Sequence, residues 1–192
     1  CDGYSVTNCY IWQVYDAGVT HQVNVPNSAG TKRYDQKNVL YKDNVFEKCN
    51  YSIEYFLGCP AGNESRMENV LFEGNLAFDA GTGFCEQRPD RNTAAHIKAW
   101  FNPTRNRAKN YLIRNNAFCG SKEMLLDVGA GLRNTDGSTS LPRLEGNVLI
   151  GRAGDAFGCL SETSGKSLVY GPEIQRLVGA RGPGNRCLML ER

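Results

Sequence analysis

Four titratable residues, His21, Glu54, Glu86 and Asp127, recur at comparable places along the chain. Glu54 lies eight residues after Phe46, and Glu86 lies eight residues after Phe78; each phenylalanine follows a similar asparagine-containing motif. Asp127 lies nine residues after Phe118, the equivalent phenylalanine of the next motif. His21 aligns with Glu86 when residues 16–22 are matched to 79–87 with a two-residue gap. Stacked carboxylates raise one another's pKa, so an acid and a base can coexist. This pattern predicts an outward catalytic column, with a solvated charged face as the alternative.

The separation of these carboxyl groups would select the chemistry. Glu54 and Glu86 on neighbouring strands would suit a retaining glycosidase, whose carboxyls are roughly 5–5.5 Å apart. Glu54 and Asp127, two strands apart, would suit an inverting enzyme at roughly 6.5–9.5 Å. The three carboxylates could alternatively hold a calcium ion, because stacked oxygen ligands suit a hard cation. No other cofactor and no transition-metal site are expected.

A longer connection, residues 87–109, lies beside the predicted column. Its candidate substrate-binding residues are Arg88, Asp90, His96, Lys98 and Trp100. Arginine and lysine suit carboxylated or hydroxylated sugars, and tryptophan can stack on a sugar face. A lyase would need a base and a charge neutraliser, for which His21 or His96 with Arg88 would serve. The alternative is a buried Trp100 and solvated basic side chains.

The elements that must position these residues follow a repeat. Five similar segments end in asparagine, at intervals of about 30 to 40 residues, which is typical of a solenoid. These asparagines are Asn8, Asn44, Asn75, Asn116 and Asn147. The apolar runs are short and alternating, which predicts strands near 39–41, 45–46, 51–56, 70–72, 111–113 and 125–128. We therefore predict an all-β, right-handed parallel β-helix of about five coils.

The asparagine column has a physical explanation. Asparagine tolerates the left-handed conformation of a sharp turn. At an inter-strand spacing of about 4.8 Å, its carboxamides can form a hydrogen-bonded ladder. The coils are predicted over residues 1–160, as the C-terminal part of a longer β-helix. The repeat is lost after about residue 160, so residues 161–192 are expected to form a cap.

Residues 15–22, 51–56, 83–90 and 95–100, together with the asparagine turns, resemble secreted bacterial β-helix proteins of the pectate-lyase-like superfamily. The resemblance implies a secreted protein, extracellular, periplasmic or at the cell surface, that meets a polysaccharide or oligosaccharide. It leaves the reaction open, because the superfamily includes lyases, hydrolases, epimerases and inert adhesins. The Asn-Thr-Asp, Asp-Asp and Gly-His-Gly motifs of polygalacturonases do not occur in the sequence.

The charge, the apolar runs and the cysteine spacing of the chain argue against several classes of protein. A net charge of +2 over 192 residues argues against a nucleic-acid binder. No apolar run reaches the length of about 18 residues needed to span a membrane. The eight cysteines include no CxxC pair. Four of them (Cys9, Cys49, Cys85 and Cys119) fall in predicted strands, which favours buried thiols over disulfides.

These observations predict a monomeric carbohydrate-active enzyme, with a glycoside hydrolase favoured over a polysaccharide lyase because carboxylates outnumber bases in the column. The alternative is a non-catalytic, glycan-binding or adhesin-type β-helix. Substrate, linkage and disulfide pairing are left open by the sequence.

Overall fold

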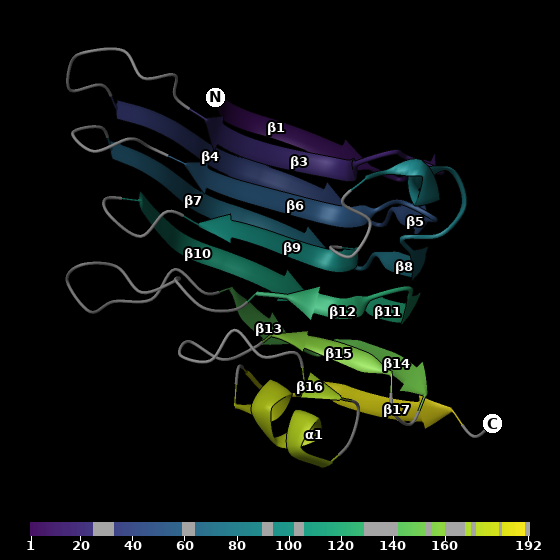
Figure 1. The fold of residues 1–192 in the computed structure, drawn as a ribbon. Helices are drawn as coiled ribbons and strands as arrows, with labels where there is room; N and C mark the ends of the chain where they lie inside the picture. Colours follow the sequence, from purple (N-terminus) through teal and green to yellow (C-terminus); the bar gives the residue numbers. More distant parts are fainter. Residues whose placement is uncertain are drawn as a thin grey trace.

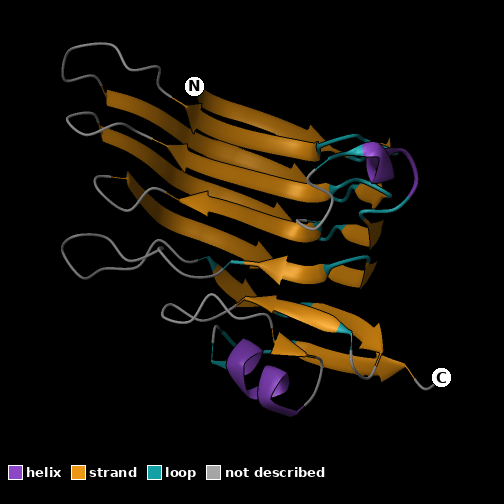
Figure 2. Ribbon diagram, viewed as in Figure 1, coloured by secondary structure: helices purple, strands orange, loops and turns teal. Residues whose placement is uncertain are grey.

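Strands in three sheets make up most of the described chain (Figures 1 and 2). The structure is a computed structural model and describes residues 1–24, 33–58, 64–89, 94–101, 106–128, 142–152, 155–159, 168–169, 172–180 and 182–190. Within these ranges, helix is confined to the 3₁₀ turn η1 (Gly83–Gln87) and α1 (Pro172–Gly179). The predicted all-β class is confirmed.

The chain visits the three sheets in a fixed order, A, then B, then C. Sheet A contains β1 (Asp2–Thr7), β4 (Arg33–Lys42), β7 (Glu64–Glu73), β10 (Asn106–Arg114) and β13 (Arg143–Glu145). Sheet B contains β2 (Tyr10–Trp12), β5 (Val45–Glu47), β8 (Leu76–Ala80), β11 (Ala117–Ser121), β14 (Val148–Arg152) and β17 (Arg186–Leu190). Sheet C contains β3 (Ala17–Asn24), β6 (Tyr51–Gly58), β9 (Ala95–Phe101), β12 (Met124–Asp127), β15 (Ala156–Cys159) and β16 (Leu168–Val169).

Three successive strands, one from each sheet, form one repeat, and each repeat lies on the previous one. Among the described strands, the pairing between repeats is parallel, and the one antiparallel pair is β15 with β16. Every strand predicted from the sequence lies in one of these sheets. The two ends of the chain lie at opposite ends of the stack, with α1 beside the last strands (Figure 1).

Residues with positive φ turn the chain from sheet A into sheet B. The set comprises Asn8, Asp43, Gly74, Asn115 and Gly146, and Gly184 has the same conformation ahead of β17, where α1 and not a strand of sheet A comes before the turn. Asparagine, aspartate and glycine are the residues that adopt this left-handed conformation most easily. A Cβ on Gly74 would lie 2.4 Å from Oδ1 of Asp43, so close stacking also requires glycine there.

A buried asparagine follows each of these turns from the second repeat onward. The ladder consists of Asn44, Asn75, Asn116, Asn147 and Asn185. The Nδ2 of each of the first four donates to Oδ1 of the next asparagine at 2.9–3.0 Å. The same Oδ1 also accepts the backbone N–H of the preceding ladder residue, as Oδ1 of Asn116 does from Asn75 at 2.8 Å. The predicted stacking of Asn44, Asn75 and Asn116 is confirmed.

The ladder differs from the prediction at both ends. Asn8 was expected to belong to it, but Asn8 occupies the turn position, and the backbone N–H of Cys9 donates to Asn44. The register of β1 with β4 is therefore one residue from the predicted alignment. Asn185 was placed in the non-repeating tail, yet it continues the ladder, and β17 pairs in parallel with β14. The repeat thus extends beyond residue 160.

Aromatic side chains fill much of the space between the sheets. Phe46, Phe72 and Phe118 form a stack, with ring centroids 5.7 and 6.3 Å apart. Tyr55 and Tyr111 pack at 4.7 Å from opposite sides of the core. All five side chains are buried. The stack of repeats is therefore a filled core that leaves only its outer faces for a ligand.

The cysteines agree with the prediction in part. Cys49 and Cys85 are buried free thiols, and burial raises the pKa of Cys49 to about 11. Cys9 is exposed, contrary to expectation, because no described strand covers the outer side of its repeat. No helix in the described ranges combines the length and apolar character needed to cross a bilayer.

Candidate functional site

Sheet C carries a column of polar residues, but its members differ from those predicted. The register aligns Thr20 with Glu54, Glu54 with Lys98 and Lys98 with Asp127. Glu54 and Asp127 therefore share a column, as predicted, and they are two strands apart. The strand between them supplies Lys98, which was predicted to bind substrate, in the place assigned to Glu86.

The charged residues of the column are each paired or hydrogen-bonded. The Lys98 ammonium contacts the Asp127 carboxylate. Oε2 of Glu54 accepts hydrogen bonds from Nε2 of Gln22 at 2.7 Å and from Oγ1 of Thr20 at 3.3 Å. Glu54 and Lys98 are each only 6% exposed. Burying charge is costly unless it is paired and hydrogen-bonded, and this network meets that condition.

His21 does not belong to the column, so its predicted place was wrong. It aligns with Tyr55 rather than Glu54, and its ring stacks on Tyr55 at 5.9 Å. Nδ1 lies 3.3 Å from the Tyr41 hydroxyl. Because side chains alternate between the faces of a strand, a shift of one residue moves His21 from the outer face into the core. Burial lowers its pKa to about 3.

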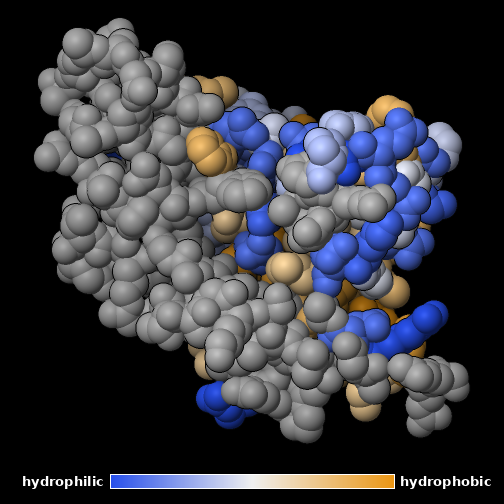
Figure 3. Space-filling view, viewed as in Figure 1, coloured by the Kyte–Doolittle hydropathy of each residue, from blue (hydrophilic) through white to orange (hydrophobic). Residues whose placement is uncertain are grey.

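Glu86 lies away from sheet C, so the predicted pair of Glu54 with Glu86 is also wrong. Glu86 is exposed on η1 and forms an ion pair with Lys122 at 2.8 Å. Both line a depression of about 430 Å³ that includes Asp79 and Asp155. Figure 3 shows hydrophilic side chains predominating around this end of the molecule.

The predicted calcium ligands do not form a cluster. Glu86 is separated from the column, and Lys98 stands between the other two carboxylates. The described residues contain no group of three or more histidine, cysteine, aspartate or glutamate side chains placed to hold a metal ion.

Arg88 anchors η1 to the first two repeats. Its guanidinium lies 5.3 Å from the Tyr15 ring centroid and 5.6 Å from that of Tyr51. It also forms an ion pair with Asp16. Planar stacking and ion pairing are both typical of arginine, and here they join segments of the same chain. These contacts favour a positioning role for Arg88 over substrate binding.

His96 lies in the core on β9. Nδ1 is 3.0 Å from Oγ of Ser52, and Nε2 is 2.7 Å from the carbonyl of Gly120. Burial lowers its pKa to about 4, although the carbonyl contacts act in the opposite direction. His96 is therefore neutral at physiological pH. Among the other predicted residues, Asp90 falls outside the described residues, and Trp100 is described only as part of β9.

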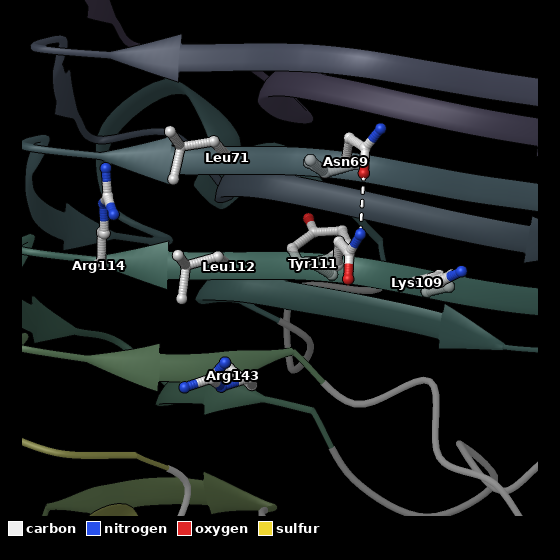
Figure 4. Close-up of a pocket in the computed structure, with 10 residues that line it drawn as sticks. Asn69, Leu71, Lys109, Tyr111, Leu112, Arg114 and Arg143 are labelled. Atoms are coloured by element: carbon white, nitrogen blue, oxygen red, sulfur yellow. Dashed lines mark hydrogen bonds between the residues drawn. The ribbon is translucent and has the colours of Figure 1, made fainter.

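A second site, which the sequence did not predict, lies on the outer face of sheet A (Figure 4). It is a depression of about 640 Å³ over β7, β10 and β13, within the usual size range of ligand pockets. Its charged lining residues are Lys109, Arg114 and Arg143. Alternation places Leu112 and Arg114 on one face but puts Lys109 on the other, so the sequence pattern alone would not have grouped Lys109 with them.

Comparison of the chain with protein-family models, with curated proteins and with solved structures gives no match. Arguments about function therefore depend on the geometry and chemistry of these two sites.

Proposed function

We propose that the three sheets form a right-handed parallel β-helix of the kind found in the pectate-lyase-like superfamily. The constant visiting order of the sheets, the parallel pairing between repeats and the asparagine ladder support this architecture. Right-handed winding is the usual hand of crossovers between parallel strands.

We further propose that this β-helix is a glycoside hydrolase with its site on sheet C. The observation that carries the proposal is the column of Glu54, Lys98 and Asp127 on adjacent strands. A fold that already has a filled apolar core gains little from burying the charged Glu54 and Lys98 on an outer face, because a buried ion pair often adds no net stability. Convergent charged and polar groups on one face are more typical of functional sites.

The separation of the two carboxylates favours an inverting mechanism. Two strand spacings place the backbones of Glu54 and Asp127 about 10 Å apart. Oε2 of Glu54 is directed toward Thr20 and Gln22 on β3, away from Asp127, so the separation suits the roughly 6.5–9.5 Å of an inverting enzyme better than the roughly 5–5.5 Å of a retaining one. Glu54, oriented by Gln22 and Thr20, takes a proton from this water, whose oxygen attacks the anomeric carbon. The Lys98–Asp127 pair delivers a proton to the leaving oxygen as the glycosidic bond breaks.

Elimination has less support than hydrolysis. The lyase hypothesis assigned the base to His21 or His96 and the charge neutraliser to Arg88. Both histidines are buried in the core and Arg88 is engaged with Asp16, so none of them faces the column. Secretion to the cell surface or beyond is part of the same proposal, since polysaccharides are met there.

One observation favours the alternative of a non-catalytic, glycan-binding β-helix. The column is a paired network with two of its charged members almost fully buried, and such a network can be structural.

Activity assays on charge-neutral substitutions separate the two functions. The chain would be incubated with a panel of plant and animal polysaccharides, and new reducing ends and unsaturated products measured. Glu54→Gln and Asp127→Asn should each lower hydrolysis at least about a hundredfold, in line with loss of general acid–base catalysis. Glu86→Gln is the matched control, because it removes an exposed, paired carboxylate from another face.

Product stereochemistry, followed by NMR, should show inversion at the anomeric carbon. Wild-type activity in folded Glu54→Gln and Asp127→Asn variants would make the column structural. Glycan binding without any bond cleavage would support the alternative function.

A further inference from the structure

The outer face of sheet B is apolar along the stack. Figure 1 shows β5, β8, β11, β14 and β17 one below another on one side of the molecule. The middle residues of these strands, such as Phe46 and Phe118, are buried in the core, so their neighbours point outward. The register aligns the outward residues in two columns. The first contains Tyr10, Val45, Leu76, Ala117, Val148 and Arg186. The second contains Trp12, Glu47, Phe78, Cys119, Ile150 and Leu188. Only Glu47 and Arg186 among them are charged.

This composition differs from that of a sheet face covered by water. Strands with one buried face normally carry polar residues at their outward positions. Sheet A follows this rule with an outward column of alternating charge. Its members are Lys42, Glu73, Arg114 and Glu145. On sheet B, four outward side chains are 45–62% exposed, namely Tyr10, Trp12, Leu76 and Leu188. A contiguous apolar patch is typical of a surface that binds a partner.

We propose that sheet B binds sheet B of a second copy of this chain, in place of the predicted monomer. The two copies are related by a twofold axis that runs parallel to the strands, between β8 and β11. This axis reverses the order of the strands, so β8 faces β11, β5 faces β14 and β2 faces β17 of the second copy. It keeps the direction of the strands, so each column of outward residues faces the same column.

The sizes of the facing side chains are complementary in this arrangement. At the centre, Leu76 faces Ala117 of the second copy and Phe78 faces Cys119, because these residues occupy the same two columns on β8 and β11. A large side chain thus meets a small one in each central pair. Interdigitation of this kind is how two stacked sheets, about 10 Å apart, exclude water between them.

The same arrangement brings the two charged residues together. Arg186 of the second copy faces Tyr10, whose hydroxyl contacts the Glu47 carboxylate. Tyr10 therefore already spans the one strand and one column that separate it from Glu47, and an arginine opposite Tyr10 has the same distance to cover. The guanidinium can lie over the Tyr10 ring and pair with Glu47. Because the axis is twofold, this pairing occurs at both ends of the interface.

A twofold axis along the stack fits this face less well. Each strand would then face itself, and the first column would face the second. Leu76 would meet Phe78 while Ala117 would meet Cys119, so large side chains would oppose large ones and small would oppose small. Glu47 would lie opposite an apolar residue instead of a cation. The size and the charge of the outward residues therefore both favour the axis parallel to the strands.

The extent of the face sets the expected affinity. Six strands about 4.8 Å apart make it about 24 Å long, and it is two outward residues wide. Such an interface is at the lower end of the range for specific complexes, so we expect a dissociation constant between about 1 and 100 µM. Sheet B is separate from the Glu54 column on sheet C, so the proposal does not depend on catalysis there.

Sedimentation equilibrium of the chain, from about 1 to 300 µM, tests the proposal. We expect a reversible equilibrium of monomer and dimer without larger species, because a twofold interface is closed. Leu76→Asp would bury a carboxylate of each copy at the centre of the interface and should weaken dimerisation at least about a hundredfold. Leu112→Asp is the matched control, because it introduces the same charge on the outer face of sheet A. It should leave the dissociation constant unchanged.

An exchange of charges tests the orientation of the two copies. Glu47→Arg alone would place like charges together and should weaken dimerisation at least about tenfold. The double variant Glu47→Arg/Arg186→Glu restores opposite charges and should recover the wild-type dissociation constant to within about threefold. Lys48, which lies 3.2 Å from Glu47, is on the same copy and is present in every variant. Melting temperatures of the dilute variants check that each chain is folded.

Four results would overturn the proposal. A wild-type chain that stays monomeric at about 300 µM would leave this face to another occupant. Unchanged dimerisation in folded Leu76→Asp would place the interface elsewhere. No effect of Glu47→Arg, or no recovery in the double variant, would exclude this orientation of the copies. Association that continues beyond the dimer would indicate non-specific contact between apolar surfaces.

Discussion

Asn116→Ala should be among the most destabilising substitutions of a polar residue in this chain. The Asn116 side chain is buried in the middle of the ladder. Its Oδ1 accepts from the backbone N–H and Nδ2 of Asn75, and its Nδ2 donates to Phe72 and Asn147. Alanine removes all of these bonds together and supplies no replacement.

The expected loss follows from the fate of each partner. The backbone N–H of Asn75 loses its acceptor while buried, which costs about 2 kcal/mol. The bonds to Phe72 and Asn147 contribute about 1 kcal/mol each. Nδ2 of Asn75 keeps its second acceptor, the carbonyl of Tyr41, so it adds little. The free energy of unfolding should therefore fall by about 4 kcal/mol.

Urea denaturation, followed by circular dichroism, measures this loss. Asn110→Gly is the matched control, because it removes one exposed hydrogen bond, from Nδ2 of Asn110 to Oδ1 of Asn69. Glycine tolerates the φ of 53° at this position, so the backbone is not strained. It should cost only about 0.5 kcal/mol. A loss below about 1 kcal/mol for Asn116→Ala would refute the reasoning. Such a small loss would mean that water, or a shift of the backbone, provides new hydrogen-bond partners for the groups that Asn116 no longer contacts.

Three further substitutions or conditions give measurable outcomes. Burial lowers the pKa of His21 to about 3 and of His96 to about 4, so between these values and about 6.5 the unfolded chain binds more protons than the folded chain. The free energy of unfolding should therefore fall on acidification, by about 2 kcal/mol per histidine at pH 5. Denaturation at several pH values should show that His96→Gln removes about half of this dependence. Gly18→Ala should lower stability by about 1–3 kcal/mol, because its Cβ would lie 2.7 Å from the Phe46 ring; an unchanged melting temperature would contradict this. Arg88→Ala should cost about 1–2 kcal/mol through lost stacking, with Arg88→Lys between it and the wild type; if glycan binding fell while stability did not, Arg88 would be a ligand residue instead.

The repeated asparagine motif made the all-β class and the stacking of parallel strands predictable from the sequence. Asparagine at fixed places correctly indicated the ladder. The left-handed conformation predicted for these asparagines instead belongs to the residue before each of them, namely Asp43, Gly74, Asn115 and Gly146. Asn185 escaped detection because its surrounding segment, which contains α1, does not resemble the earlier repeats. Asn8 was misplaced because a turn residue and a ladder residue can both be asparagine, and one position separates them.

The candidate site was predicted less accurately, since it depends on register. Glu54 and Asp127 were correctly assigned to one column. Counting forward from each phenylalanine assumed that all corners between sheets B and C have equal length, but η1 extends the corner of the third repeat. Glu86 consequently lies on that corner, and Lys98 fills the strand position. An offset of one residue cannot be detected from composition, yet it moves a side chain to the opposite face of its strand.

The way in which the ladder ends affects how the stack terminates. Nδ2 of Asn185 is close to the carbonyls of Leu144, Val178 and Gly182, at 2.6, 3.3 and 2.9 Å. The bond to Leu144 on β13 is equivalent to those of the earlier asparagines, but the remaining hydrogen of Asn185 is directed to the segment that bears α1, where each earlier asparagine donated to the next repeat. An open stack of parallel strands can otherwise add copies of itself without limit. Asn185 and α1 therefore act as a stop on the ladder side, and their loss would leave an unsatisfied, self-complementary end prone to fibre-like growth.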